Sequence, residues 1–219
     1  MTFDYGAPFG YFFKDKGWFK KFAIASLLTY TLIGAAPILG WTIEIVRRVG
    51  KGEEPEVPEL SDWKAYWKLG GQFAFMNVIW LLPVLLAVIG LYMPLIFVNS
   101  IKPGMLLAVF GGTLVCVLVF LLVYSCIYIF LFPSMMILLA ETGSAWKAMN
   151  PARLWKVARA HFTGHLMVFL IVGVGLLNLM LLIAPFTLFL LLPSMLVYAG
   201  LVTAHYAGQL MRMRNPLVR

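Results

Sequence analysis

Histidines are the residues of this sequence whose spacing comes nearest to a chemical motif. His161 and His165 stand four residues apart, so both would project from one face of a helix and could bind one metal ion. The residue after His161 is Phe162, however, where the zinc-protease motif requires a glutamate. His165 and His205 could instead hold a haem iron between two helices. Interfacial hydrogen bonding or phosphate contact is the simpler role for His161 and His165, so we expect no metal site and no cofactor.

Charged residues inside apolar segments are the second place to look for chemistry. Glu44 is the sole acidic residue in such a segment, and Arg47 and Arg48 follow it three and four positions later. This spacing favours a local ion pair on one helix, with a substrate or proton site as the alternative. Proton- or sodium-coupled transport usually relies on carboxylates inside the membrane, so the sequence disfavours a coupled transporter.

The sequence shows no recognisable catalytic motif. Cys116 and Cys126 are ten residues apart, which is neither a metal-binding nor a redox spacing. We find no nucleophile–base pair, metal-ligand set or phosphate-binding loop. An intramembrane protease would need embedded Ser and His or paired Asp residues, and the sequence does not reveal them. We therefore predict no catalytic residue and a protein that is not an enzyme.

The amino-acid composition indicates a membrane protein. Of the 219 residues, 62% are hydrophobic and only 12% are charged, against about 45–50% and about 25% in soluble domains. Such a chain needs lipid around its apolar side chains. The net charge is +8, but the basic residues flank apolar segments, as membrane anchors do, so we do not expect nucleic-acid binding.

Four segments contain no charged side chain: residues 22–43, 69–101, 103–140 and 160–211. A helix needs about 20 residues to cross the hydrocarbon. We therefore expect one long helix near 71–98, a second from 105 to 132 or beyond, and two in the last segment with a turn near Ala184 and Pro185. The first segment is either one span over 18–46 or a hairpin of two short helices. Pro37 lacks a backbone donor, so the hairpin would break at residues 34–37.

The positions of the basic residues favour the hairpin. With a cytoplasmic N-terminus, the hairpin places every basic residue except Lys102 on the cytoplasmic side, whereas a single span leaves a basic cluster outside. We predict an all-α integral membrane protein with about six membrane-embedded helices, four long spans plus the short hairpin. Both termini would face the cytoplasm of a prokaryotic cell. Residues 1–219 would form one polytopic domain, with a weak internal repeat of about 1–99 in 105–219.

Two further stretches are typical of amphipathic helices that lie in the membrane interface. Asp62 is an N-cap candidate for a helix over 63–69, and Asn150 with Pro151 begins a helix over 151–160. Each basic residue near anionic lipid gains about 1 kcal/mol. The predicted interfacial lipid anchors are Trp18, Lys20, Lys21, Trp63, Trp67, Lys68, Arg153, Trp155, Lys156 and Arg159.

A stripe of small residues marks the last apolar segment. Gly200, Ala204 and Gly208 recur at intervals of four, which places them on one helix face and lets another helix approach closely. The stripe serves either packing within the chain or an oligomer contact.

Two stretches of the chain carry a family resemblance. The first comprises Trp18-Phe19-Lys20-Lys21, Gly34, Pro37, Gly40, Arg47-Arg48, Gly50-Lys51-Gly52-Glu53, Pro58-Glu59 and Asp62-Trp63. The second is Ala140-Glu141-Thr142-Gly143, followed by Asn150-Pro151 and the helix through Arg159. Together they resemble a prokaryotic membrane family known as a domain of unknown function, number 4013. The resemblance implies a multi-pass membrane protein and assigns no catalytic residue.

These observations lead to two hypotheses about function. The first is a non-enzymatic accessory or scaffolding subunit that packs against other membrane proteins, or against itself, and against anionic lipid. The alternative is a carrier or binder of a lipid or another lipophilic molecule, which would use helices kinked by proline and the basic face.

Overall fold

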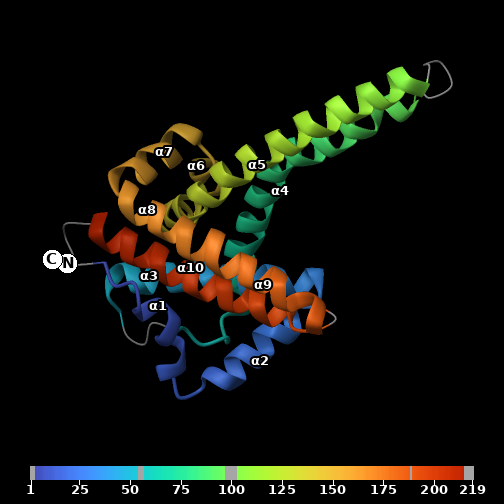
Figure 1. Ribbon diagram of the computed structural model, residues 1–219. Coiled ribbons are helices and arrows are strands. Elements are labelled where there is room, and N and C mark those ends of the chain that lie inside the picture. The colour runs from blue at the N-terminus through green and yellow to red at the C-terminus, as the bar shows by residue number, and fades with distance from the viewer. Residues whose placement is uncertain (1–2, 54–56, 97–102, 188, 215–219) are drawn as a thin grey trace. The chain divides into compact units, whose positions relative to one another are not determined.

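The computed structural model describes residues 3–53, 57–96, 103–187 and 189–214, and this part of the chain is helical, without a β-strand. The all-α prediction is confirmed, while Lys102 lies outside the described residues. The chain divides into two compact units (Figure 1). Unit 1 comprises residues 1–76 and 130–219, and unit 2 comprises residues 77–129.

The N-terminal part of unit 1 has four helical segments: α1 (Ala7–Gly10), η1 (Phe12–Lys14), α2 (Trp18–Thr29) and α3 (Leu32–Lys51). Helices α2 and α3 form the predicted hairpin, but the chain turns at Tyr30 and Thr31 rather than at residues 34–37. The Thr31 side chain caps α3, because its Oγ1 accepts a hydrogen bond from Gly34 N at 2.9 Å. Pro37 is accommodated inside α3 and does not break it.

Two long helices, α4 (Trp63–Ile96) and α5 (Pro103–Thr142), contribute to both units. A separate interfacial helix over 63–69 was predicted, and this prediction is wrong, because these residues are the first turns of α4. Asp62 nevertheless caps the helix as expected, with its Oδ1 3.3 Å from Ala65 N. Helix α5 extends well beyond residue 132 and contains Pro133.

Gly40 and Gly70 allow α3 and α4 to cross at close distance. A Cβ atom at Gly40 would lie 2.0 Å from Tyr66 O, and one at Gly70 would lie 1.7 Å from Ala36 O. The backbones of α3 and α4 are therefore in direct contact at these two residues. Gly70 does not end a helix here; it allows two helices to cross.

The C-terminal part of unit 1 begins with α6 (Ala145–Ala148) and α7 (Pro151–Ala160). A continuous helical stretch follows, made of α8 (Phe162–Val168), the π-helical segment η3 (Phe169–Leu176), α9 (Leu177–Ile183) and η4 (Ala184–Thr187). The chain then turns into α10 (Leu192–Arg214). The predicted turn near Ala184 and Pro185 and the predicted helix 151–160 are both confirmed.

Helix α10 forms the core of unit 1. It packs against α2 and α3, and its residues 201–208 are all buried. The N-terminal strap, residues 3–14, runs along the same helix (Figure 1). Tyr206 donates to Tyr5 O at 2.7 Å, Tyr198 donates to Phe9 O at 3.2 Å, and Tyr11 donates to Leu201 O at 3.2 Å. The strap therefore provides hydrogen-bond partners for the hydroxyl groups of Tyr198 and Tyr206 on this helix.

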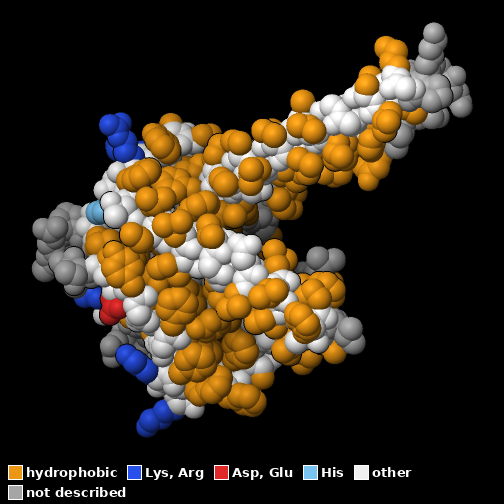
Figure 2. Space-filling model, viewed as in Figure 1, with side chains coloured by type: hydrophobic (Ala, Val, Ile, Leu, Met, Phe, Trp, Pro, Cys, Tyr) orange, Lys and Arg blue, Asp and Glu red, His pale blue; other side chains and the backbone are white. Residues whose placement is uncertain are grey.

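Three segments of the described chain are long and apolar enough to cross a membrane: Trp63–Met93, Gly104–Thr142 and Phe162–Thr187. This supports a membrane protein, but with fewer spans than the six embedded helices predicted. Helix α2 has only 12 residues, the second half of α3 carries Glu44, Arg47 and Arg48, and α10 is buried inside unit 1. Much of the surface in Figure 2 consists of hydrophobic side chains.

Unit 2 consists of the adjoining parts of α4 and α5. Two tyrosine hydroxyls of α5 donate to α4, Tyr124 to Trp80 O and Tyr128 to Asn77 Oδ1. Apolar side chains are exposed along both helices, Leu86 at 66% and Leu107 at 74% among them. Among the described residues of unit 2, no packed core covers these side chains, and this exposure suits helices that face lipid.

Candidate functional site

Arginines hold together the C-terminal ends of three helices in unit 1. Arg47 of α3 donates through Nε to Ala140 O of α5 at 2.8 Å. Arg214 of α10 forms an ion pair with Glu141 of α5 at 3.0 Å. The guanidinium of Arg212 lies against Gly52, where an added Cβ atom would be 3.0 Å from it. The carbonyl end of a helix is electronegative, so these cations stabilise the arrangement.

Glu44 forms the local ion pair predicted from its spacing. Its carboxylate lies 3.5 Å from Arg47 Nη1 and 3.8 Å from Arg48 Nε. The side chains are only about a quarter exposed, which makes a paired structural role a sufficient account of this carboxylate. The arginines also join the two stretches on which the family resemblance rests, since α3 and the end of α5 belong to one stretch each.

Lys21 has a different environment from the other predicted lipid anchors. It is 6% exposed, and its Nζ lies 3.0 Å from Asp15 and 2.8 Å from Glu59. Beside it, Trp41 Nε1 donates to Pro58 O at 3.0 Å. A buried cation with two carboxylate partners fixes the 57–60 segment to the hairpin and is not available to lipid.

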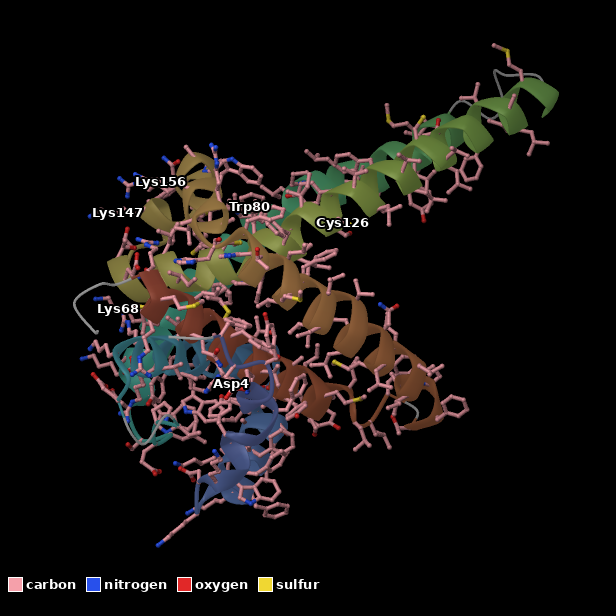
Figure 3. The ribbon with its side chains drawn as sticks, turned by 60° about the vertical axis from the view of Figure 1, so that its left-hand side comes forward. Asp4, Lys68, Trp80, Cys126, Lys147 and Lys156 are labelled. Carbon is pink, nitrogen blue, oxygen red and sulfur yellow. The ribbon has the colours of Figure 1, made fainter. Side chains whose placement is uncertain are left out.

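The remaining predicted anchors stay at the surface of unit 1. Trp18 is partly exposed, and the exposed side chains are Lys20, Trp63, Trp67, Lys68, Arg153, Trp155, Lys156 and Arg159. Figure 3 shows Lys68, Lys147 and Lys156 pointing outward from α4, α6 and α7 on one side of unit 1. We call Lys20, Lys68, Lys147, Arg153, Lys156 and Arg159 the basic rim.

Helix α7 carries three residues of the basic rim, Arg153, Lys156 and Arg159. Asn150 Oδ1 accepts hydrogen bonds from Ala152 N at 3.0 Å and Arg153 N at 3.2 Å, which confirms the predicted N-cap. Leu154 and Val157 are buried, so the opposite face points outward. On this face an open hollow of about 440 Å³ is lined by Ala152, Trp155, Lys156, Arg159 and Ala160.

A second hollow of unit 1, about 390 Å³, has a different lining of Gly71, Gln72, Phe75, Gly143, Ser144, Ala145 and Trp146. The Phe75 and Trp146 rings meet edge to face at 5.7 Å. Gln72 Oε1 accepts a hydrogen bond from Ala145 N at 3.1 Å, which ties α6 to α4. The lining carries no charged side chain, so this hollow suits an apolar group rather than an anion.

Among the described residues, no group of three or more His, Cys, Asp and Glu side chains could hold a metal ion. His165 is fully buried, with Nε2 2.8 Å from Ser134 Oγ and Nδ1 3.2 Å from His161 O. His205 contacts the Tyr11 ring at 4.3 Å and Gln209 Nε2 at 3.2 Å. His165 and His205 thus have separate partners.

The pairing of Ser134 with His165 was not predicted, because 31 residues separate them in the sequence. Spacing along the chain offers no signal for it. The pair resembles a nucleophile and its base. Both side chains are inaccessible to solvent, however, and Ser134 lies inside α5, where backbone N–H groups are engaged in the helix and unable to form an oxyanion hole. The geometry supports a hydrogen bond that joins α5 to α8.

The predicted stripe on α10 packs within the chain. A Cβ atom at Gly208 would lie 2.5 Å from Val49 Cβ, and one at Gly200 would lie 3.5 Å from Thr42 Cγ2. Ala204 is fully buried. This face of α10 therefore contacts α3 within the chain.

A second stripe of small residues was overlooked in the sequence. Gly104, Ala108, Gly112 and Cys116 recur at intervals of four on α5, and all four are exposed. No described atom lies within 4 Å of a Cβ atom built at Gly104 or Gly112. The same four-residue interval that marked α10 could have identified this face.

Comparison with protein-family models gives a match over residues 23–191 to the family described as protein of unknown function (DUF4013). The match spans the arginine contacts of α3 with α5, both hollows and every residue of the basic rim except Lys20. Searches of the curated proteins and of the solved structures gave no match.

Proposed function

This chain belongs to the DUF4013 family of proteins of unknown function, and we propose that it is a non-enzymatic accessory or scaffolding subunit of a prokaryotic cytoplasmic membrane. In this proposal unit 2 packs against other membrane proteins within the bilayer. The basic rim lies at the cytoplasmic surface, where anionic lipid attracts it. Both termini lie on that side.

The exposed stripe on α5 is the observation that carries the proposal. Helices in a membrane associate where small side chains let backbones approach, because lipid gives them no hydrophobic reason to do so. The stripe on α10 is already occupied by α3. Gly104, Ala108, Gly112 and Cys116 are exposed instead, which supports a contact with a helix of another chain at this face.

The subunit contact is tested by gentle extraction of the tagged protein and mass spectrometry of what purifies with it. We expect a second membrane protein, or a second copy of this chain, at a fixed ratio. Gly112→Leu should abolish that association while the protein stays folded, because the new side chain fills the space for the partner. Leu107→Phe is the matched control, since Leu107 is 74% exposed and lies off the stripe.

Two results would contradict the proposal. One is wild-type protein that always emerges alone and monomeric. The other is equal loss of the partner in Gly112→Leu and Leu107→Phe, which would mean that the stripe has no special role. A monomer that carries a stoichiometric amphiphile would favour the alternative function, a carrier of a lipid or lipophilic molecule.

The orientation has its own test, thiol labelling of intact cells from outside. Cys116 and Cys126 are exposed on α5, so both are first replaced by serine. Lys51→Cys and Lys147→Cys should stay unlabelled until the membrane is permeabilised, whereas Gly104→Cys, at the opposite end of α5, should label at once. Labelling of position 51 or 147 in intact cells would overturn the orientation.

A further inference from the structure

We propose that the hollow on α7 binds the phosphate group of an anionic phospholipid, with Lys156 and Arg159 as the cationic ligands and Trp155 in contact with the headgroup region. The proposed function involves only a general attraction between the basic rim and anionic lipid, whereas this proposal assigns one specific lipid site within that rim. It does not depend on the subunit contact of unit 2.

The first step of the argument is that α7 holds this face outward. The Asn150 cap fixes the start of the helix, and Leu154, Val157 and Ala158 anchor its other face in unit 1. Lys156 and Arg159 stand three positions apart, so they project to neighbouring points of the exposed face. Ala152 and Ala160 have small side chains at the two ends of the hollow and leave it open.

The second step concerns charge. Arg47, Arg48, Arg214 and Lys21 all have carboxylate partners. Lys156 and Arg159 form no ion pair within the part of the chain that the structure describes, and α7 itself contains no acidic residue. His161 lies at the end of α7, and burial, together with the charge of Arg214, holds its pKa below the ordinary value. This favours the neutral imidazole, so the cations of the hollow are Lys156 and Arg159. The hollow thus presents two uncompensated cations, and an anion is the complementary ligand.

The third step identifies the anion as lipid. Helix α7 ends at Ala160, and the apolar segment Phe162–Thr187 begins two residues later. A hollow immediately before a span lies at the depth of the headgroups. Trp155, 52% exposed, belongs to the residue type that is enriched at that depth. The open hollow of about 440 Å³ leaves room for a phosphoglycerol headgroup.

The experiment measures lipid retained by the whole protein. Detergent-purified chain is titrated with phosphatidylglycerol or phosphatidylcholine, and bound lipid is counted by native mass spectrometry. We expect one phosphatidylglycerol to be retained more tightly than any phosphatidylcholine. In K156Q/R159Q the affinity for this lipid should fall roughly 25-fold, since each cation contributes about a factor of five. The variant K14Q/K16Q is the control, because it removes the same charge from exposed residues outside both the hollow and the basic rim.

Several outcomes would overturn the proposal. Equal losses in the two double variants would indicate attraction by total charge, without a site. Equal retention of phosphatidylcholine would exclude a cationic phosphate site selective for anionic lipid. Displacement of the bound lipid by millimolar inorganic phosphate or glycerol phosphate would identify a soluble ligand as the natural occupant. Circular dichroism of each variant confirms that folding is unchanged, and co-purification of the partner subunit reports separately on the proposed function.

Discussion

Two glycines of unit 1 and two glycines of unit 2 have opposite environments. In unit 1, Gly40 and Gly70 occupy positions where a Cβ atom would lie 2.0 Å or less from the backbone of another helix. In unit 2, no described atom lies within 4 Å of a Cβ atom built at Gly90 or Gly112. The same residue type therefore brings helices together in one unit and leaves a helix face open in the other. Unit 1 uses these small residues to build its fold, whereas those of unit 2 are left exposed, as the proposed subunit contact requires.

The polar contacts of the two units follow the same division. Unit 1 joins distant segments by ion pairs and hydrogen bonds, such as Lys21 with Asp15 and Glu59 and Ser134 with His165. Unit 2 has two tyrosine hydroxyls that donate from α5 to α4. A network of specific contacts makes unit 1 sensitive to single substitutions, while apolar side chains facing lipid tolerate exchange. Three substitution pairs test this difference, in decreasing order of expected effect.

The largest effect is expected for Gly70→Ala. The added methyl group would lie 1.7 Å from Ala36 O, and because the obstacle is backbone, α3 and α4 must separate. We expect a loss of about 3 kcal/mol in the free energy of unfolding, measured by thermal or denaturant unfolding in detergent. Gly71→Ala is the matched control, since no described atom lies near its Cβ and alanine favours a helix. Similar melting temperatures for the two variants would contradict the close crossing.

An intermediate effect is expected for Lys21→Gln. It leaves Asp15, whose side chain is 13% exposed, without its cation, whereas Glu59 at 76% exposure is stabilised by water. We expect a loss on the order of 2 kcal/mol. Lys20→Gln removes the same charge from an exposed neighbour and should change the unfolding free energy little. If both variants unfolded alike, Lys21 would be a surface anchor, as the sequence suggested.

Features determined by neighbouring residues could be predicted from the sequence. The start of α7 depends on Asn150 and Pro151 alone, and the turn after α9 on Ala184 and Pro185, so both were predicted correctly. The turn between α2 and α3 was placed a few residues late, because the proline at 37 drew more weight than the capping side chain of Thr31.

Features determined by contacts between distant segments could not be predicted. The sequence predicted separate helices over 63–69 and near 71–98, and only the structure shows that α4 is continuous where α3 approaches Gly70. The burial of Lys21 depends on Glu59, which lies 38 positions later in the sequence. Likewise, nothing in the spacing of α10 shows that its stripe faces α3. Among the candidate sites, residue types on α7 were predictable, but the hollow that Lys156 and Arg159 share required the fold.

The smallest effect is expected in unit 2, for Tyr128→Phe. The change removes the hydroxyl that donates to Asn77 Oδ1 but keeps the ring 6.5 Å from that of Trp80. Hydrogen bonds between membrane helices contribute about 0.6 kcal/mol on average, because both partners find other donors and acceptors when the helices separate. Tyr92→Phe, at an exposed position of α4, is the control for loss of a hydroxyl. A destabilisation by Tyr128→Phe as large as that of Gly70→Ala would mean that unit 2, like unit 1, depends on specific contacts, and the division between the units would fail.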